Sequence, residues 1–193
     1  MRSFEFARQM DNGSPVREGN ADKMLFENAQ LPEYQTKYSA GADFFAAEDT
    51  VVPSIWKNIP KMIHLVSSFF FVFNTLPEDK KTKNAFAPTL VHTGVKASME
   101  DDEVLYLYNR SSNPKKMGLA LANGVGVIDK DYYNNPDNDG EIMFAFYNFH
   151  PWDTHIKAGD RIGQGIFAKY LRPTVGLRMK DVERTSGFGS TNK

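Results

Sequence analysis

The chain has 193 residues, contains no cysteine and carries a formal net charge of −1. The absence of cysteine excludes disulfides, a thiol nucleophile and thiolate metal sites, and the small net charge gives no overall basic field for duplex nucleic acid or an anionic membrane. The length suits one domain with a substantial core, so any phosphate binding must come from a local group of residues.

No apolar run approaches the roughly 20 residues that a membrane span requires, and the opening sequence M-R-S-F-E-F-A-R-Q-M-D lacks the apolar core of a signal peptide. A chain without cysteine is compatible with a reducing compartment. We therefore expect a cytoplasmic protein that binds neither nucleic acid nor membrane.

The N-terminal part, residues 1–38, is polar and contains the turn clusters N-G-S-P and R-E-G-N. It predicts an edge strand at Phe4–Ala7 and surface loops. Residues 40–49 then form a glycine-containing turn that leads into a short apolar run. On the residues alone, Asp43 in this run is a turn or capping carboxylate.

Strands are expected near Val51 and at Leu90–Ala97, and an unusual segment lies between them. Its Phe-rich half, S-S-F-F-F-V-F, either packs on the protein's own surface or covers a partner, because each buried Phe contributes about 1.5 to 3 kcal/mol. Its charged half, P-E-D-K-K-T-K-N, predicts a solvated loop. Long loops of this kind are often functional.

Alternating patterns predict further strands from Val104, at Ile142–Phe149 and at Ile162–Leu171. The second carries bulky residues on both faces, which indicates burial on both sides. Short strands with Gly and Pro turns and no convincing amphipathic helix predict an all-β sandwich or barrel.

The segment from Tyr108 to Tyr132 holds the residues best suited to chemistry. Its apolar run ends on Asp129, and a strand that ends in a carboxylate is a common way to hold a general base. The alternative is that Asp129 merely ends a strand at a turn. The segment opens with cations and hydroxyls suited to anionic oxygens: Arg110, Ser111, Ser112, Lys115 and Lys116.

The C-terminal residues are rich in Gly, Ser and Thr and predict a flexible end. Arg184, Phe188, Ser190 and Thr191 nevertheless offer a cation, a ring and two hydroxyls, which suits a lid over a nucleoside triphosphate. The histidines show no H-E-x-x-H spacing, and neither G-x-x-x-x-G-K-[ST] nor G-x-G-x-x-G occurs, so zinc hydrolysis, P-loop hydrolysis and dinucleotide binding have no support.

Five motifs in order resemble those of the trimeric dUTPases, which cut dUTP to dUMP and pyrophosphate and so keep uracil out of DNA and supply dUMP. The motifs are A-G-A-D-F-F-A-A-E-D at 40–49, R-S-S at 110–112, L-A-N with G-V-I-D-K-D-Y over 121–132, G-D-R-I-G-Q at 159–164, and Arg184 with S-G-F-G-S-T at 186–191. Together they span roughly residues 38 to 191.

The resemblance implies a jelly-roll barrel over residues 1–180, with an inserted loop at about 65–88 and a flexible C-terminal arm at 181–193. It implies a homotrimer in which each active site takes motifs from three subunits. It also implies Mg²⁺ as cofactor, with Asp43 touching the ion through water, since Mg²⁺ binds mainly through water and substrate phosphates.

For catalysis the resemblance implies that Asp129 orients and deprotonates the water that attacks the α-phosphorus. Asn123 would read the uracil edge, although Asn-Gly is also a good turn dipeptide. Tyr132 would pack on the deoxyribose and reject UTP, or else be a core aromatic beside Tyr133. Met143 is a base contact or a core residue. The substrate-binding set is Arg110, Ser111, Ser112, Asn123, Gly126, Val127, Ile128, Tyr132, Met143, Gln164, Arg184, Phe188, Gly189, Ser190 and Thr191.

The sequence departs from the family pattern in several places. Ser112 stands where glycine is common in the family, and the interval from Arg184 to Phe188 is one residue shorter than in many of its members. Residues Tyr133–Asp139 are an insertion between Tyr132 and Gly140, which we expect to form a loop at the rim. Asp160 and Arg161 are expected to form a structural ion pair.

Two other functions remain open. A dCTP deaminase resembles this fold, but the complete G-F-G-S-T arm and the I-D-x-D-Y motif favour a dUTPase. Some phage-type members bind regulatory proteins, so the insertion at 65–88 is a candidate surface for such a partner.

Overall fold

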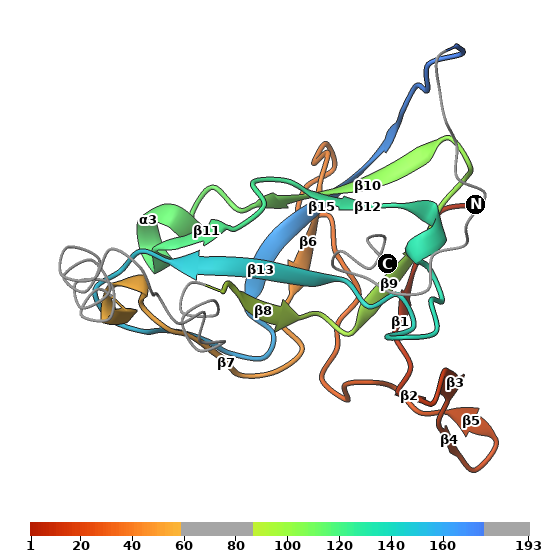
Figure 1. Ribbon diagram of the computed structural model, residues 1–193, viewed down its shortest axis with the longest axis horizontal. Helices are drawn as coiled ribbons and strands as arrows, with labels where there is room; N and C mark the ends of the chain where they lie inside the picture. The colour runs from red at the N-terminus through yellow and green to blue at the C-terminus, as the bar shows by residue number, and fades with distance from the viewer. Residues whose placement is uncertain (59–86, 176–193) are drawn as a thin grey trace, which may run out of the picture.

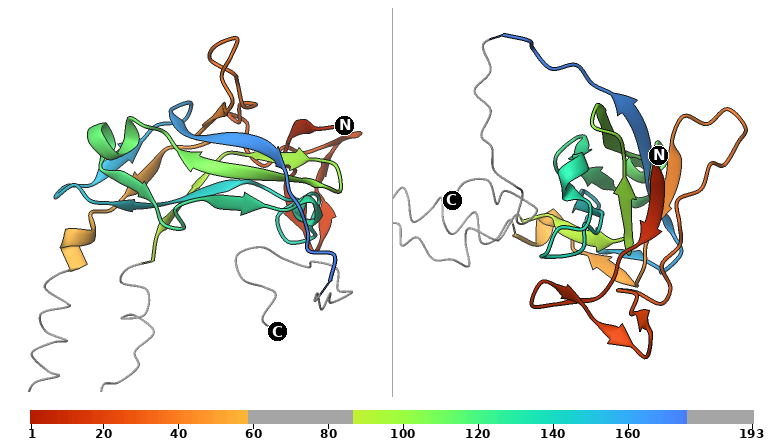
Figure 2. Two further views of the ribbon diagram at one scale, coloured as in Figure 1. Left: turned by 90° about the horizontal axis from the view of Figure 1, so that it is seen from above. Right: turned by 90° about the vertical axis from the view of Figure 1, so that its right-hand side faces the viewer.

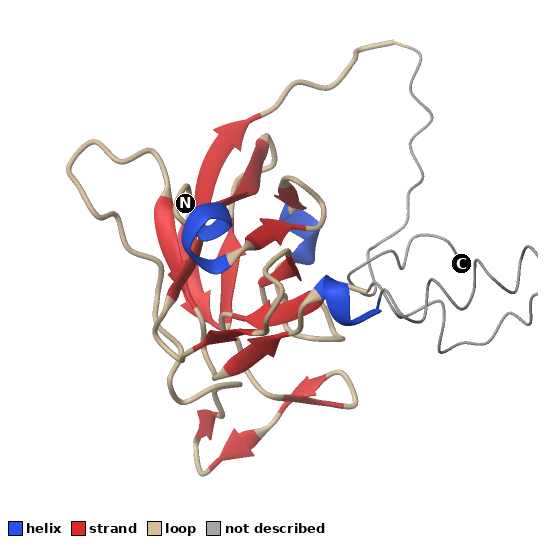
Figure 3. Ribbon diagram, turned by 90° about the vertical axis from the view of Figure 1, so that its left-hand side faces the viewer, coloured by secondary structure: helices blue, strands red, loops and turns tan. Residues whose placement is uncertain are grey.

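The computed structural model describes residues 1–58 and 87–175. Figure 3 shows that this part of the chain is almost entirely strand and loop. The strands are β1 (Ser3–Phe6), β2 (Met10–Asp11), β3 (Ser14–Pro15), β4 (Arg17–Glu18), β5 (Ala21–Asp22), β6 (Ala42–Phe45), β7 (Thr50–Val52), β8 (Thr89–His92), β9 (Val95–Ser98), β10 (Glu103–Asn109), β11 (Leu119–Leu121), β12 (Gly126–Ile128), β13 (Met143–Asn148), β14 (Thr154–Ile156) and β15 (Arg161–Lys169). The helical turns are η1 (Ile55–Asn58), α3 (Asn113–Met117) and η2 (Lys130–Tyr132).

Two antiparallel sheets enclose the hydrophobic core. One has the strand order β12-β10-β15-β6 and the other the order β11-β13-β8, and they face each other in Figures 1 and 2. Phe44 of β6 packs across the core on Phe144 of β13, with ring centroids 5.6 Å apart. Leu105 of β10 and Phe146 of β13 are buried in the same cluster. The predicted all-β fold is confirmed.

The strand expected at Ile142–Phe149 is β13, the central strand of its sheet. Phe144, Phe146 and Asn148 on one face are buried, whereas Met143 and Tyr147 on the other face are half-buried, so the expected burial of both faces is only partly met. The expected N-terminal edge strand is β1, which pairs with β9. After it, the hairpins β2–β3 and β4–β5 project from the barrel at the lower right of Figure 1.

The single strand expected at Leu90–Ala97 is two strands that pair with different partners, β8 with β13 and β9 with β1. The break lies at Gly94, whose φ of +66° is a left-handed conformation that glycine adopts without strain. The buried carboxylate of Glu141 accepts the Gly94 N–H at 3.0 Å and fixes this turn. Alternation continues across the break, which is why the sequence pattern did not reveal it.

None of the helical turns in the described part of the chain has the length and hydropathy of a membrane-spanning helix. The predicted insertion at 65–88 lies outside the described residues apart from Ala87 and Pro88, and the predicted arm at 181–193 lies wholly outside them. The domain boundary at residue 180 stays a prediction.

Candidate active site

Three of the predicted site residues meet at a buried carboxylate on β6. Asp43 is 2% exposed, and its Oδ1 accepts a hydrogen bond from Gln164 Nε2 at 2.9 Å. Its Oδ2 lies 3.3 Å from Arg161 Nη1 and 3.8 Å from Arg110 Nε. We call Asp43, Arg110, Arg161 and Gln164 the Asp43 cluster. One acid therefore orients two cations and an amide at the same end of the barrel.

The register of the sheet explains why residues so far apart in sequence meet here. Gln164 of β15 is directly opposite Asp43 of β6 on one side and Tyr108 of β10 on the other. Arg110 follows β10 directly, and its Nη1 donates to the carbonyl oxygen of Arg161 at 3.1 Å. The strand ends therefore bring together residues from three separate motifs.

The expected ion pair between Asp160 and Arg161 is wrong. Arg161 pairs with Asp43, whereas the Asp160 carboxylate accepts the backbone N–H of Lys157 at 2.8 Å. Asp160 precedes β15, which begins at Arg161, and its carboxylate closes the turn back to Lys157, so it is not turned toward the Arg161 side chain. Sequence reasoning thus missed Arg161 as a member of the Asp43 cluster.

The short helix α3 follows Arg110 and was also missed. The sequence features that could have indicated this helix are the Pro in its first turn and Gly118 just after its end, which has a φ of +65°. The buried side chain of Asn113 donates to Asn109 Oδ1 at 2.8 Å and to the carbonyl oxygen of Ile162 at 2.7 Å. It clamps the turn that carries Ser111 and Ser112, of which Ser111 is exposed and Ser112 half-buried.

The predicted catalytic residue lies elsewhere. Asp129 is exposed, directly follows β12 and precedes η2. It lines a pocket of about 620 Å³ together with Asp101, Glu103, Lys130, Asp131, Tyr170 and Arg172. Carboxylates outnumber cations on this lining.

The predicted base-reading segment precedes Asp129. Asn123 is exposed at the turn before β12, and Val127 and Ile128 belong to β12 itself. Gly126 is buried against β10, where a Cβ would lie 2.9 Å from the Cβ of Leu107. Glycine is therefore required for the close approach of these two strands.

Tyr132 is only 6% exposed. Its hydroxyl donates to the carbonyl oxygen of Glu141 at 2.9 Å and accepts from Asn138 Nδ2 at 2.8 Å. Met143 begins β13 opposite His92 and is half-buried. Arg184, Phe188, Gly189, Ser190 and Thr191 lie outside the described residues.

The insertion Tyr133–Asp139 is not simply a rim loop, which corrects the expectation from sequence. Asn135 and Asp139 within it are buried. Arg8, from the N-terminal part of the chain, and Lys96 of β9 both pair with Asp139. These partners lie far from the loop in sequence, and no local pattern indicates them.

The Asp43 cluster and Asp129 lie at opposite ends of β10. Leu105 pairs with Ile128, so Asp129 lies beside Val104, whereas Arg110 follows the other end of the strand. The six residue-to-residue steps from 104 to 110 span about 20 Å at the rise of an extended strand. In Figure 1, α3 and the end of β12 accordingly lie at opposite ends of the sheet. Within one chain, the predicted base and the predicted phosphate-binding residues do not meet.

Comparison with known proteins identifies the family. A family model described as dUTPase matches residues 75–192.

The chain belongs to the dUTPase family.

The deoxyuridine 5'-triphosphate nucleotidohydrolase of Lactococcus lactis is 51% identical over 110 residues, which cover 55% of this chain and 73% of that protein. The crystal structure of the dUTPase from Streptococcus mutans covers 89% of this chain and 98% of its own, with 34% identity and a TM-score of 0.62. A mutant dUTPase from phage phi11 of S. aureus shares the fold at 18% identity, with a TM-score of 0.53 and coverage of 82% of this chain and 95% of that one. The predicted membership of the dUTPase family is confirmed.

Proposed function

We propose that this protein carries out the hydrolysis of dUTP to dUMP and pyrophosphate in a homotrimer, with Asp129 activating the water that attacks the α-phosphorus. The observation that carries the proposal is the Asp43 cluster, in which Arg110 and Gln164 converge from separate motifs on one buried acid. Cations and amide donors held in this way suit a triphosphate, because phosphoryl transfer depends mainly on positioning and charge stabilisation.

The distance of about 20 Å along β10 between Arg110 and Asp129 supports a site shared between chains. A general base must lie within hydrogen-bonding reach of the proton that it removes. In a closed trimer, the Asp43 cluster of one subunit can face Asp129 of a neighbour, and the C-terminal residues Arg184 and Phe188 of a third can cover the nucleotide.

Asp43 also fits a role near Mg²⁺. In the described part of the chain, no three His, Cys, Asp or Glu side chains form a group that could hold a metal. Mg²⁺ typically keeps several waters and binds through one or two carboxylates and substrate phosphates, so Asp43 would suffice through water. The ion, once bound with the triphosphate, would supply charge neutralisation. The phage phi11 enzyme is described with a structural Mg(II) ion.

For the nucleoside we propose that the turn at Asn123, which is exposed in the single chain, and the backbone of 126–129 read uracil. Once the nucleotide covers these groups, a wrong base would leave polar groups unpaired. We propose Tyr132 as the ring beside C2′ of the deoxyribose and Met143 as a further base contact. Ser111 and Ser112 would add hydroxyl donors to the phosphate site, and Gly189, Ser190 and Thr191 would complete the arm.

The proposal is tested by hydrolysis of dUTP, UTP, dTTP and dCTP with the wild type and with Asp129→Asn. Loss of the base should reduce dUTP turnover about 10²- to 10⁴-fold. Asp101→Asn is the matched control, because Asp101 lines the same pocket and forms an exposed ion pair with Lys130, a type of contact worth under about 1 kcal/mol.

Full dUTP turnover by Asp129→Asn would remove Asp129 from the mechanism. Release of ammonia from dCTP, measured alongside, would instead favour the deaminase. A regulatory protein partner at the insertion 65–88 and a cytoplasmic location remain proposals from sequence.

A further inference from the structure

We propose that the inserted loop Tyr133–Asp139 is a positioning device for Tyr132, and that through this ring it sets the preference for deoxyribose over ribose. The inference rests on the proposed role of Tyr132 beside C2′. It adds Asn138 and Asp139 as residues that act on specificity without touching the nucleotide.

The loop holds Tyr132 at both ends of the residue. At the ring, Asn138 Nδ2 donates to the Tyr132 hydroxyl at 2.8 Å, while that hydroxyl donates to the carbonyl oxygen of Glu141 at 2.9 Å. At the backbone, Asn135 Nδ2 donates to the Tyr132 carbonyl oxygen at 3.1 Å. A ring held at its hydroxyl and at its own peptide has little freedom to tilt.

The two asparagines are themselves joined. Asn135 Nδ2 donates to Asn138 Oδ1 at 2.7 Å, and the same oxygen accepts the Gly140 N–H at 3.2 Å. Gly140 has a φ of +81°, and a Cβ there would lie 2.5 Å from the Tyr132 carbonyl oxygen. The loop therefore folds tightly back onto Tyr132 and behaves as one unit with it.

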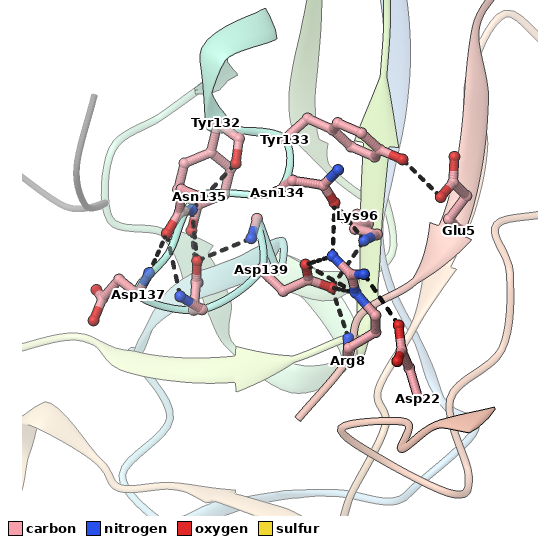
Figure 4. A network of polar contacts seen from close by, with 12 residues as sticks. Glu5, Arg8, Asp22, Lys96, Tyr132, Tyr133, Asn134, Asn135, Asp137 and Asp139 are labelled. Carbon is pink, nitrogen blue, oxygen red and sulfur yellow. Dashed lines mark hydrogen bonds and ion pairs between the residues drawn. The ribbon is translucent and has the colours of Figure 1, made fainter. Parts of the chain in front are cut away.

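Asp139 anchors this unit to the barrel, as Figure 4 shows. Its carboxylate is fully buried and accepts Arg8 Nη2 at 2.6 Å, the Arg8 backbone N–H at 2.8 Å and Lys96 Nζ at 2.8 Å. Burial opposes ionisation of Asp139, but the hydrogen bonds from Arg8 and Lys96 outweigh it and lower the pKa of the carboxyl. Lys96 is itself only 3% exposed.

Lys96 also contacts the start of the loop. Its Nζ donates to Asn134 Oδ1 at 2.5 Å and lies 5.0 Å from the centroid of the Tyr133 ring. The Tyr133 hydroxyl in turn donates to Glu5 of β1 at 2.7 Å. Both ends of the loop are thus tied to the β1–β9 pair, and buried charges arranged in this way tolerate little displacement.

A ring held in this manner rejects a 2′-hydroxyl because it cannot move aside. Loosening the loop should let the ring shift and admit UTP, while dUTP still fits. The loop should therefore affect the two substrates unequally, whereas a loop that only stabilises the fold would affect both to the same extent.

The test is the ratio of kcat/KM for dUTP to kcat/KM for UTP, measured on one preparation of the full-length protein. Asn138→Ala and Asp139→Asn should each lower this ratio about tenfold, the effect expected for one lost hydrogen bond. Asp137→Asn is the matched control and should keep the wild-type ratio. Asp137 is exposed, its carboxylate points away from the network in Figure 4, and only its backbone N–H joins the loop.

Because both substrates are measured on the same sample, a smaller folded fraction cancels from the ratio. If Asp139→Asn yields no folded protein, the ratio measured for Asn138→Ala alone decides whether the loop affects specificity. In a Tyr132→Phe background, Asn138→Ala should lower the ratio by less than it does in the wild type, since the hydroxyl is gone while the contacts of Asn138 with Asn135 and Gly140 are still there to lose.

An unchanged ratio in Asn138→Ala, with both substrates affected equally, would overturn the inference and leave the loop a purely structural role. Failure of the proposed function has a different signature. In that case the wild type and Asp137→Asn would not hydrolyse dUTP, or Asp129→Asn would retain full turnover.

Discussion

Two inactive variants should restore each other's activity when they are combined in one trimer. Arg110→Ala removes a cation of the Asp43 cluster, and Asp129→Asn removes the proposed base. The two positions lie about 20 Å apart at opposite ends of β10. Each shared site would then take its cluster from one chain and its base from a neighbour, so that a mixed trimer contains sites with both residues intact.

The size of the effect follows from counting chains. In an equal, random mixture, a site has an intact cluster with probability one half and an intact base from its neighbour with probability one half. About one quarter of all sites should therefore be active. If a single chain supplied both residues, no site in any mixture would be active.

The assay is pyrophosphate release from dUTP by the two variants co-expressed in equal amounts and purified through one tag that both carry, so that no trimer is selected over another. A second mixture serves as the control, in which wild type is combined with the double variant Arg110→Ala/Asp129→Asn. Sharing between chains predicts that about one quarter of its sites are active, and a site within one chain predicts about one half. Mixed trimers that remain as inactive as the parent variants would refute the shared site.

Gly163→Ala should destabilise the fold by about 1 to 3 kcal/mol or more, because a Cβ there would lie 1.9 Å from Cε1 of the buried Phe144 ring; an unchanged thermal midpoint would contradict this packing. His92 forms a hydrogen bond with Glu141 that raises the His92 pKa, while burial partly opposes the shift. This stabilisation is fully present below the unfolded pKa of about 6.5 and is lost as the pH rises through the higher folded value. The difference in unfolding free energy between wild type and His92→Gln should therefore shrink as the pH rises above about 6.5, and urea unfolding that shows a constant difference would argue against the pair.

Much of the fold was predictable because alternation is a local property. The period-two pattern that predicted β13 reflects side chains that point alternately to the two faces of a strand. The same pattern misled at Gly94, where the chain turns while the alternation continues. The helix α3 was missed because its Pro and Gly signals enclose only one turn.

The candidate site was predictable only as a set of residue types. R-S-S with its cations suggested an anion site, and an acid after an apolar strand suggested a base. The position of Arg161 beside Asp43 could not be predicted, because it depends on the register between β6 and β15.

The sequence by itself determined the all-β class, the family and the residues available for chemistry, because periodicity and motif order are properties of the sequence that do not depend on contacts between distant segments. Only the tertiary structure decided that Asp43, Arg110 and Gln164 meet, that Asp129 lies away from them, and that Arg8 anchors a loop 131 positions away. The physical reason is that strand register and buried charge pairing are set by contacts between distant segments, which form only when the whole barrel closes.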